Sequence, residues 1–310
     1  MALYSAIFKP LGPMTKIPDS QVLFGAFCHA YKSIYGETEL EKMLHKQSTK
    51  PYFFLSSFFP QDFLPMPIGL QFERFKDINE VNHGVFKLSK KIKYISIGIY
   101  NDLQSNPQEF LKNFYQRIIN EDYFFSGENL FLQKKSEAKI PNRIFYKEMR
   151  IRNSKQGEEK QLFYNYVTYV HPSMMFQAYI RIEDDSEVEK IKNVFTSMRY
   201  LSLGGNKSVG YNLFDIVKLD QINEFENKLG VKLLLSKSVG DEYVDLSKST
   251  YQLKVFHNKF NGISPTRHRK TVIGFLEGSL LSTEKFYSGS LIEDTINGKK
   301  IYQNFIGLLF

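Results

Sequence analysis

A strand pattern followed by an amphipathic helix pattern opens the chain, and it constrains the fold more than any other feature. Side chains alternate over residues 3–8 as in a half-buried strand. After a proline-rich loop, Asp19 or Ser20 supplies an N-cap, and Gly36 is placed to end the helix. Between the caps the apolar residues recur at helical spacing: Leu23, Phe27, Ala30, Tyr31 and Ile34. Strand, loop and helix in this order predict the first half of a ferredoxin-like unit.

A second group of patterns completes this order further along the chain. Strands are predicted over residues 163–170, 176–182 and 211–218. A helix predicted over residues 188–198 separates the last two strands, and Ser186 with Glu189 predicts a capping box at its start. We therefore expect an α+β protein with a ferredoxin-like (RRM-like) domain over residues 1–218 that is split by insertions.

The remaining segments are less regular. Phenylalanine and proline cluster within residues 37–90, which predicts an ordered but irregular insertion. Three isoleucines alternate over residues 95–99 as on one face of a strand. Residues 219–310 carry short strand patterns between turns, with one helix pattern over residues 221–228. They predict a second, mostly β half, for which a degenerate second ferredoxin-like unit is one interpretation.

The composition excludes several kinds of protein. The chain has 310 residues, with 41 Lys and Arg against 33 Asp and Glu and a formal net charge of +8, so a polyanionic partner is one expectation. Its single cysteine, Cys28, rules out an internal disulfide and a cysteine zinc site, and the histidines have no metal-ligand spacing. No apolar run approaches a membrane span, and no signal-peptide pattern is present. We therefore expect a cytoplasmic protein without metal, cofactor or membrane contact.

Residues 204–210, with the sequence Gly-Gly-Asn-Lys-Ser-Val-Gly, form a glycine-rich loop between a predicted helix and a predicted strand. A P-loop or dinucleotide-binding loop joins a strand to a helix, and a P-loop needs Gly before its Lys, whereas Asn206 precedes Lys207 here. The glycines can expose backbone N–H groups, and Asn206, Lys207 and Ser208 add polar groups that suit nucleic-acid phosphates. The alternative is a helix C-cap with a solvated turn, which composition alone favours.

Cationic side chains elsewhere extend this candidate surface. Eight lysines and arginines lie within residues 134–155, Arg143 and Arg150 among them. Arg267, Arg269 and Lys270 form a further cluster around His268. Each cluster alone is typical of a solvated face, but together with the loop they describe a surface that could follow a single nucleic-acid strand.

The glycine-rich loop and its flanks resemble the RAMP superfamily of CRISPR proteins. That family carries the signature G-G-x-[KR]-S-x-G-x-G-x-F, which this chain matches at Gly204, Gly205, Lys207, Ser208, Gly210 and Phe214. The last glycine of the signature is Asn212 here, a residue that also tolerates left-handed backbone. Residues 19–30, 63–67, 87–93 and 269–279 are similar to further segments of its Cas-five-like branch, and in particular to the fourth subunit of type III-A Csm effector complexes.

The resemblance implies a non-catalytic subunit in antiviral defence that grips the 5′ handle of the guide RNA. Its partners would be the guide RNA, the large polymerase-type subunit and a backbone RAMP subunit, with one copy at the foot of the hetero-oligomer. A β-hairpin thumb that displaces a guide nucleotide is expected within residues 128–165. Guide pairing, rather than this protein, would read the target.

The resemblance also ranks the candidate RNA-binding residues. The first candidates are the signature residues Gly204, Gly205, Lys207, Ser208 and Gly210. Charge and position add Asn206, Arg143, Arg150, Arg267, Arg269 and Lys270.

Two other functions stay open. Related RAMP proteins cleave repeat RNA without a metal by a histidine near the end of the first helix, and His29 lies on that helix here. Because His29 shares an apolar helix with Phe27 and Cys28, a partly buried structural histidine is the simpler interpretation. The third possibility is a scaffold that binds only proteins, for which RNA affinity would not fall steeply with salt.

Overall fold

The chain folds into a mixed α+β structure with several sheets, as the sequence predicts. The computed structural model describes residues 2–69, 83–128, 130–156, 159–199, 201–204, 210–225, 227, 229–257, 270–296 and 299–310. Within these residues, no helix combines the length and apolar character needed to cross a bilayer.

The central sheet has the strand order β11-β1-β10-β2, and all its neighbouring strands are antiparallel. Its strands are β1 (Ala2–Pro10), β2 (Phe53–Leu55), β10 (Phe176–Ile182) and β11 (Phe214–Ile222), and β3 (Phe59–Pro60) also pairs with β10. Strand β10 is buried along its whole length because both faces of the sheet are covered. Strand β11 begins at Phe214 rather than Tyr211, since Tyr211 and Asn212 belong to a turn.

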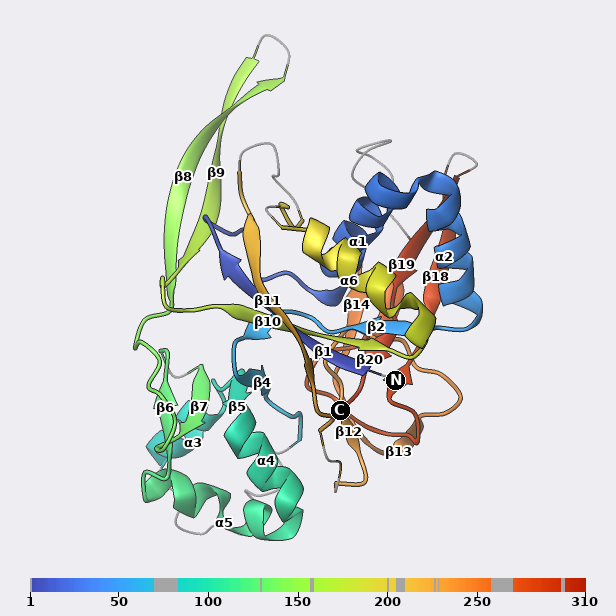
Figure 1. The fold of residues 1–310 in the computed structure, drawn as a ribbon. Coiled ribbons are helices and arrows are strands. Elements are labelled where there is room, and N and C mark those ends of the chain that lie inside the picture. The colour runs from blue at the N-terminus through green and yellow to red at the C-terminus, as the bar shows by residue number, and fades with distance from the viewer. Residues whose placement is uncertain are drawn as a thin grey trace.

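Helices α1 (Ser20–Tyr35) and α6 (Val188–Ser197) lie together on one face of this sheet (Figure 1). The Asp19 side chain accepts a hydrogen bond from the Val22 N–H and caps α1, and Gly36 ends the helix with a φ of 89°, as predicted. The ring of Phe27 on α1 lies 5.4 Å from that of Phe195 on α6, so the two helices share a core.

The predicted capping box at the start of α6 is wrong. The short 3₁₀ turn η1 (Asp185–Glu187) precedes the helix, and the Asp184 side chain accepts from the Ser186 N–H there. The residue at the N-cap position of α6, Glu187, makes no side-chain capping bond. Asp184 therefore takes the place that the sequence pattern assigned to Ser186.

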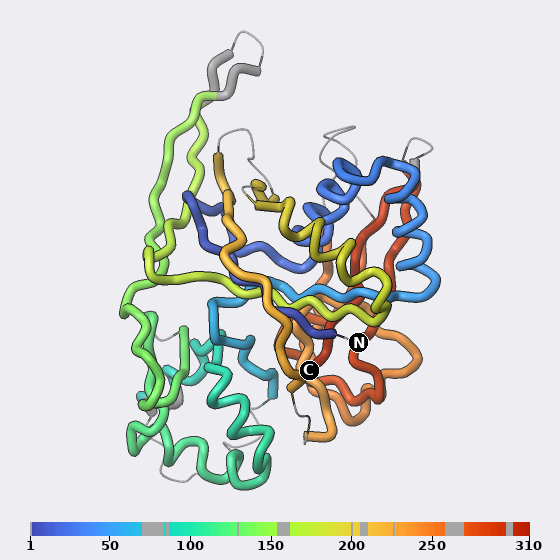
Figure 2. The backbone as a smooth tube through the Cα atoms, in the orientation of Figure 1, coloured from blue at the N-terminus to red at the C-terminus, as the bar shows by residue number. Residues whose placement is uncertain are grey.

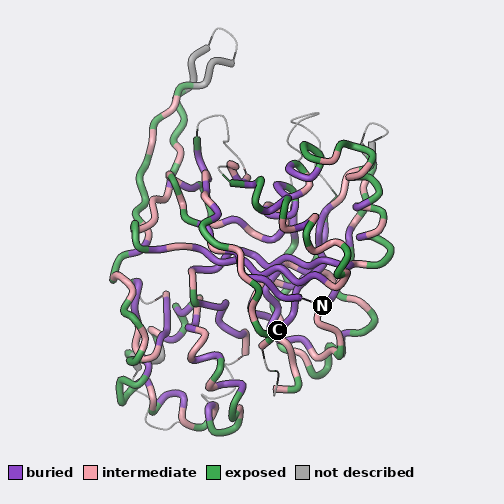
Figure 3. The backbone as a smooth tube through the Cα atoms, viewed as in Figure 1, coloured by how far each residue is buried: buried purple, intermediate pink, exposed green. Residues whose placement is uncertain are grey.

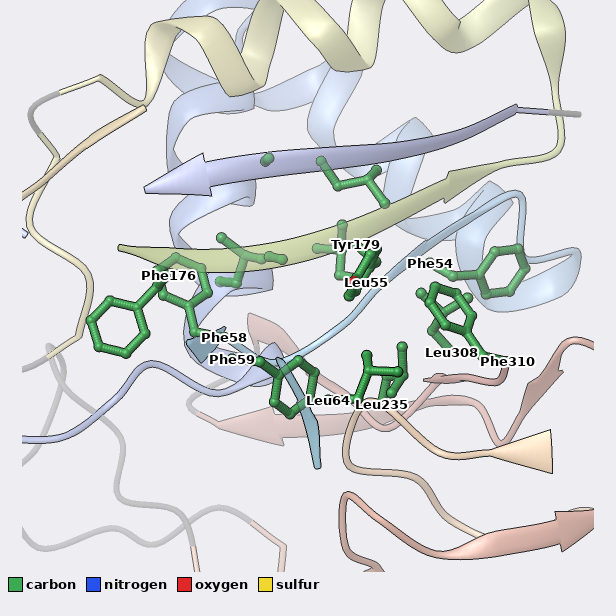
Figure 4. Close-up of a cluster of buried hydrophobic side chains, with 14 of the residues drawn as sticks. Phe54, Leu55, Phe58, Phe59, Leu64, Phe176, Tyr179, Leu235, Leu308 and Phe310 are labelled. Carbon is green, nitrogen blue, oxygen red and sulfur yellow. The ribbon is translucent and has the colours of Figure 1, made fainter. Parts of the chain in front are cut away.

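The other face of the central sheet packs against the C-terminal part of the chain. Figure 4 shows Leu308 and Phe310 beside Phe54 and Tyr179. The ring centroids of Phe310 and Tyr179 are 4.9 Å apart. The main core cluster extends in sequence from residue 2 to residue 310, and the boundary predicted after residue 218 falls inside β11. One core thus joins both predicted halves.

The range 37–90 is more regular than predicted where the structure describes it. It contains α2 (Glu37–Thr49), β2 and β3 of the central sheet, β4 (Phe63–Pro65) and α3 (His83–Ser89). The buried amide of Gln47 on α2 donates to the carbonyl of Phe53 and accepts from the N–H of Tyr52. The amide thereby ties α2 to the start of β2.

A second sheet has the order β4-β5-β7-β6. Its remaining strands are β5 (Tyr94–Ser96), β6 (Tyr123–Ser126) and β7 (Phe131–Lys134), accompanied by α4 (Ile97–Ser105) and α5 (Pro107–Ile119). The strand predicted from the isoleucines at 95–99 is wrong beyond Ser96. The Ser96 hydroxyl accepts from the Ile99 N–H, and this N-cap starts α4 at Ile97.

The C-terminal part consists of short paired strands in its described residues. These are β12 (Lys232–Leu233), β13 (Asp245–Thr250), β14 (Leu253–Phe256), β15 (Val272–Phe275), β16 (Leu280–Ser282), β17 (Tyr287–Ser288), β18 (Leu291–Ile296), β19 (Lys299–Asn304) and β20 (Gly307–Leu308). The helix predicted over residues 221–228 is wrong where the structure describes it, because Gln221 and Ile222 end β11 and residues 223–225 are irregular.

A long hairpin formed by β8 (Phe145–Gln156) and β9 (Glu159–Val170) projects from the body of the molecule (Figures 1 and 2). Most of its described outer length is exposed (Figure 3). The thumb was predicted within residues 128–165, but the hairpin begins only at Phe145. The first part of the predicted range contains β7, which belongs to the second sheet.

Candidate nucleic-acid interface

Backbone pairing joins the two ends of the glycine-rich loop, residues 202–204 and 210–213, which we call the foot of the loop. The Leu203 N–H donates to the Asn212 carbonyl at 2.8 Å, and Ser202 forms an antiparallel bridge with Leu213. Gly204 and Gly210 have φ angles of 99° and 73°, in the left-handed region that glycine adopts without strain. Residues Gly205, Asn206, Lys207, Ser208 and Val209 lie outside the described residues. The foot therefore fixes where the segment that contains them begins and ends.

Asn212 ties this foot to the loop that follows β1. Its φ is 56°, which confirms that asparagine supplies the left-handed backbone where the RAMP signature has glycine. The Asn212 N–H donates to the Pro13 carbonyl at 2.9 Å, and its side-chain Oδ1 accepts from the Thr15 N–H at 2.8 Å. Asn212 therefore holds the foot of the loop through both its backbone N–H and its side chain.

The hairpin meets the glycine-rich loop at Tyr211. The guanidinium carbons of Arg152 and Arg150, both on β8, lie 4.7 Å and 5.9 Å from the centroid of the Tyr211 ring. Arg150 also donates to the Tyr169 hydroxyl on β9 and to Glu148 at 3.1 Å. A guanidinium held over an aromatic face keeps its N–H donors in a fixed plane, which suits phosphate recognition.

The electrostatics around Tyr211 reflect this cationic neighbourhood. Burial alone would raise the pKa of Tyr211, but hydrogen bonding from Arg150 and Arg152 to its hydroxyl, followed by the charges of these two arginines, lowers that pKa below its usual value. The Tyr211 side chain is only 2% exposed, and its hydroxyl has no well-aligned hydrogen-bond partner among the described residues. The two guanidinium groups therefore approach both the ring and the hydroxyl of Tyr211, without the alignment of a regular hydrogen bond to the hydroxyl.

The other predicted cations divide between two places. Arg143 lies two residues before β8, with its guanidinium carbon 4.9 Å from the Tyr146 ring and its Nε 3.6 Å from Glu128. The Lys270 N–H donates to Asp294 at 2.9 Å, and its carbonyl accepts from Gln303, so Lys270 is tied to β18 and β19. Figure 1 places that strand pair beyond α6 as seen from the hairpin.

The structure thus brings Arg150 to the end of the loop and leaves Arg143 at the base of the hairpin. Lys270 belongs to a separate strand pair. Arg267 and Arg269 lie outside the described residues.

His29 is exposed on α1, so the interpretation as a partly buried structural histidine is wrong. Its backbone carbonyl accepts from the Ser33 hydroxyl. Val22 of α1 lies next to Gly204, and His29 is seven residues further along the helix, about 10 Å along its axis. Among the described residues no three His, Cys, Asp or Glu side chains gather as metal ligands would.

Three residues of this interface were not singled out from the sequence: Arg152, Tyr169 and Tyr211. The available signal was the alternation of Arg150 and Arg152 in one strand, which places both side chains on the same face. Tyr211 follows the last loop glycine directly, but its contact with the hairpin depends on how two distant segments meet.

Among known proteins, the sequence is similar to a Csm4 protein. No protein-family model matches the chain. The chain is 22% identical to the CRISPR system Cms protein Csm4 of Methanocaldococcus jannaschii, over 87% of this chain and 80% of that protein.

Solved structures share the fold over nearly the whole chain. A chain in the crystal structure of the Csm3–Csm4 subcomplex of the type III-A CRISPR–Cas interference complex matches with a TM-score of 0.67 and 18% identity, over 98% of this chain and 99% of the other. A chain of a Csm1–Csm4 cassette in complex with pppApA matches with a TM-score of 0.61 and 15% identity, over 99% and 96%. The comparisons confirm the resemblance inferred from the sequence: the chain is similar in sequence to a Csm4 protein and shares its fold with a chain in each of these Csm4-containing structures.

Proposed function

We propose that this chain is a non-catalytic, RNA-binding subunit of a type III-A CRISPR interference complex that grips the 5′ handle of the guide RNA. The observation that carries the proposal is the contact at Tyr211, where the foot of the glycine-rich loop meets Arg150 and Arg152 of the hairpin. The hairpin guanidinium groups, which suit phosphate recognition, therefore lie beside the described end of the glycine-rich loop.

The central sheet supports the ferredoxin-like interpretation. The elements β1, α1, β2, β10, α6 and β11 follow one another in the βαββαβ order, and the sheet order is β11-β1-β10-β2. In this arrangement the described end of the loop before β11, at Tyr211, contacts the middle of β8 through Arg150 and Arg152. We propose that the hairpin is the thumb and that handle phosphates run between it and the loop.

Partners follow from the proteins that this chain resembles. Solved structures of that fold contain Csm4 together with Csm3 or with Csm1. We propose that this chain likewise docks a backbone RAMP subunit and the large polymerase-type subunit, with one copy at the foot of the complex.

The test is binding to a labelled single-stranded RNA that carries the 3′ end of the CRISPR repeat, with a scrambled RNA for comparison. The double variant Lys207→Ala/Ser208→Ala is expected to bind the repeat RNA about tenfold more weakly, because two phosphate contacts are lost. The matched control is Lys42→Ala/Ser48→Ala, which removes the same side-chain types from exposed positions on α2. Equal binding by wild type and both variants, measured in the assembled complex, would contradict the proposal.

The same samples test the alternative that this chain is a metal-independent endoribonuclease. Its supporting observation is that His29 is exposed and therefore accessible to a substrate. Cleavage of the repeat RNA in the presence of EDTA that disappears in His29→Ala would assign catalysis to this chain. We expect intact RNA in both samples. A pure scaffold would bind repeat and scrambled RNA equally weakly at every salt concentration.

A further inference from the structure

Asn212 stands where the RAMP signature has its last glycine, and its side chain makes contacts that a glycine could not make. A glycine would also adopt the left-handed backbone of this position. It would keep the backbone bond from residue 212 to the Pro13 carbonyl and the neighbouring bond from the Leu11 N–H to the Leu213 carbonyl. The asparagine side chain is therefore an addition to the signature. Only 1% of Asn212 is exposed, and a buried amide needs hydrogen-bond partners.

The partner of this side chain is Thr15. The Asn212 Oδ1 accepts from the Thr15 N–H at 2.8 Å, and the Asn212 Nδ2 donates to the Thr15 Oγ1 at 3.2 Å. A Cβ built on Gly204 would lie 4.0 Å from the same Nδ2, so the amide also borders the other end of the loop. The side chain thereby fastens the foot of the loop to the segment that follows β1.

Residues 11–15, which we call the bridging segment, hold the hairpin as well. The Met14 N–H donates to the Thr168 carbonyl on β9 at 2.8 Å, and the Thr168 N–H donates to the Met14 carbonyl at 2.7 Å. Met14 is buried, and Thr15 follows it directly in the chain. Two adjacent residues of the bridging segment therefore connect the hairpin to the foot of the loop.

This connection matters because the hairpin has little other support. Among the described strands β8 and β9 form a sheet of their own, and a lone two-stranded hairpin is marginally stable. Its position relative to the loop depends on the bridging segment and on the contact of Arg150 and Arg152 with Tyr211. A ligand that spans two binding elements gains an effective concentration that is highest when their spacing is fixed at the matching distance.

We propose that Asn212 is a positioning residue that fixes the distance between the glycine-rich loop and the hairpin, and so strengthens the binding of RNA that contacts both. The inference rests on the proposed function, since it takes RNA phosphates to contact both elements. Asn212 acts through Thr15 and the bridging segment rather than by touching RNA.

The test is a cycle of variants in the full-length chain, assembled into its complex and titrated with the labelled repeat RNA. Lys207→Ala/Ser208→Ala weakens the loop side, and Arg150→Ala/Arg152→Ala weakens the hairpin side. Each pair is measured separately and then combined. The product of the two separate losses in affinity, divided by the combined loss, is a ratio that reports the effective concentration.

The whole cycle is repeated in Asn212→Gly, which keeps the left-handed backbone and removes the bonds to Thr15. The matched control is the cycle in Asn106→Gly. The Asn106 side chain likewise accepts from a backbone N–H, that of Glu109, but it caps α5, at the opposite end of the molecule from the hairpin in Figure 1. Unfolding temperatures are recorded for every protein.

The ratio is expected to fall at least about fivefold in Asn212→Gly and to stay at the wild-type value in Asn106→Gly. Asn212→Gly should still fold, because the backbone bonds of the foot remain and Thr15 is exposed, so that water can replace the lost acceptor. An unchanged ratio in Asn212→Gly overturns the inference. An equal fall in Asn106→Gly also overturns it, since general destabilisation would then explain the effect.

A conservative variant identifies the bond that acts. Asn212→Asp keeps an acceptor for the Thr15 N–H and is expected to keep the wild-type ratio. Its added charge weakens all the RNA complexes of the cycle alike and cancels in the ratio. A ratio as low as that of Asn212→Gly would overturn the role of this bond.

The proposed function and the inference fail in different ways. If neither the loop pair nor the hairpin pair weakens RNA binding in the wild-type background, the proposed function fails and the inference fails with it. If both pairs weaken binding and the ratio is the same with asparagine and with glycine at position 212, only the inference is refuted.

Discussion

Tyr211 joins the glycine-rich loop to the hairpin through its ring. The ring is buried and faces two guanidinium groups, whereas the hydroxyl has no well-aligned partner among the described residues. We expect Tyr211→Phe to change the free energy of unfolding by less than about 0.5 kcal/mol, because the ring and its cation–π contacts remain. Tyr211→Leu should lower it by about 2 kcal/mol, since the aromatic faces are lost. Urea unfolding measures the free energy of unfolding of both variants. An equal loss in the two variants would show that the Tyr211 hydroxyl contributes to stability.

Lys46 on α2 makes a pH-dependent link to the segment before α6. Its ammonium lies 2.8 Å from Asp184 and 2.9 Å from Glu187. The hydrogen bond from Lys46, followed by that from Ser186, lowers the pKa of Asp184 from 3.8 to about 2. A lowered carboxyl pKa contributes stability that is complete above the ordinary pKa and is lost as the pH falls toward the lowered one.

Replacing Lys46 removes this linkage. Lys46→Met is expected to lower the free energy of unfolding by up to about 1 kcal/mol at neutral pH, because the pair is partly exposed. The difference from wild type should shrink as the pH falls from about 4 to about 2. Chemical unfolding at several pH values measures it, and a difference that grows in acid would contradict this account.

The hairpin predicts how RNA binding depends on salt. If Arg150 and Arg152 each contact one phosphate, the plot of log affinity against log salt for a single strand should become shallower by about 1.4 in Arg150→Ala/Arg152→Ala. Lys147 lies on the other face of the same strand, opposite Thr168, so Lys147→Ala should leave the slope unchanged. Fluorescence anisotropy titrations at four salt concentrations test this. A slope change in the Lys147 variant alone would reverse the assignment of the two faces.

Elements with an uninterrupted apolar period were predicted well. The predicted range for β10 agrees with Phe176–Ile182, and both ends of α1 follow from Asp19 and Gly36. The strand predicted over residues 95–99 is wrong beyond Ser96 because the spacing of its isoleucines fits both one face of a strand and the start of a helix. The N-cap bond of Ser96 decides between the two, and such a bond forms only when the chain turns there.

The molecule as a whole is held by a core that crosses the predicted division into two halves. Phe310 stacks on Phe225 at 4.5 Å and contacts Tyr179 of the central sheet at 4.9 Å. Phe310→Ala is therefore expected to lower the free energy of unfolding by about 3 kcal/mol. Far-ultraviolet circular dichroism and tyrosine fluorescence should report one coincident transition in both proteins. Two separate transitions in wild type would mean that the halves unfold independently.

The candidate interface was only partly accessible from the sequence. The loop was recognisable because Gly204, Lys207, Ser208 and Gly210 have a fixed spacing. The contact of Arg152 with Tyr211 could not be predicted, since it depends on how β8 and β9 pair and on how the middle of β8 lies against the end of the loop. Which side chains of the hairpin share a face with Arg150 and Arg152 also needed the register, because a shift of one residue in β9 would have turned its side chains to the other face.

The hydrogen bond between Leu203 and Asn212 keeps the ends of the glycine-rich loop together whatever lies between them. Doubling the length of a closed loop costs only about 0.6 kcal/mol of closure entropy. Insertions and deletions between these anchors are therefore cheap for the rest of the protein. The length and sequence of this segment can therefore vary while the rest of the fold keeps its stability.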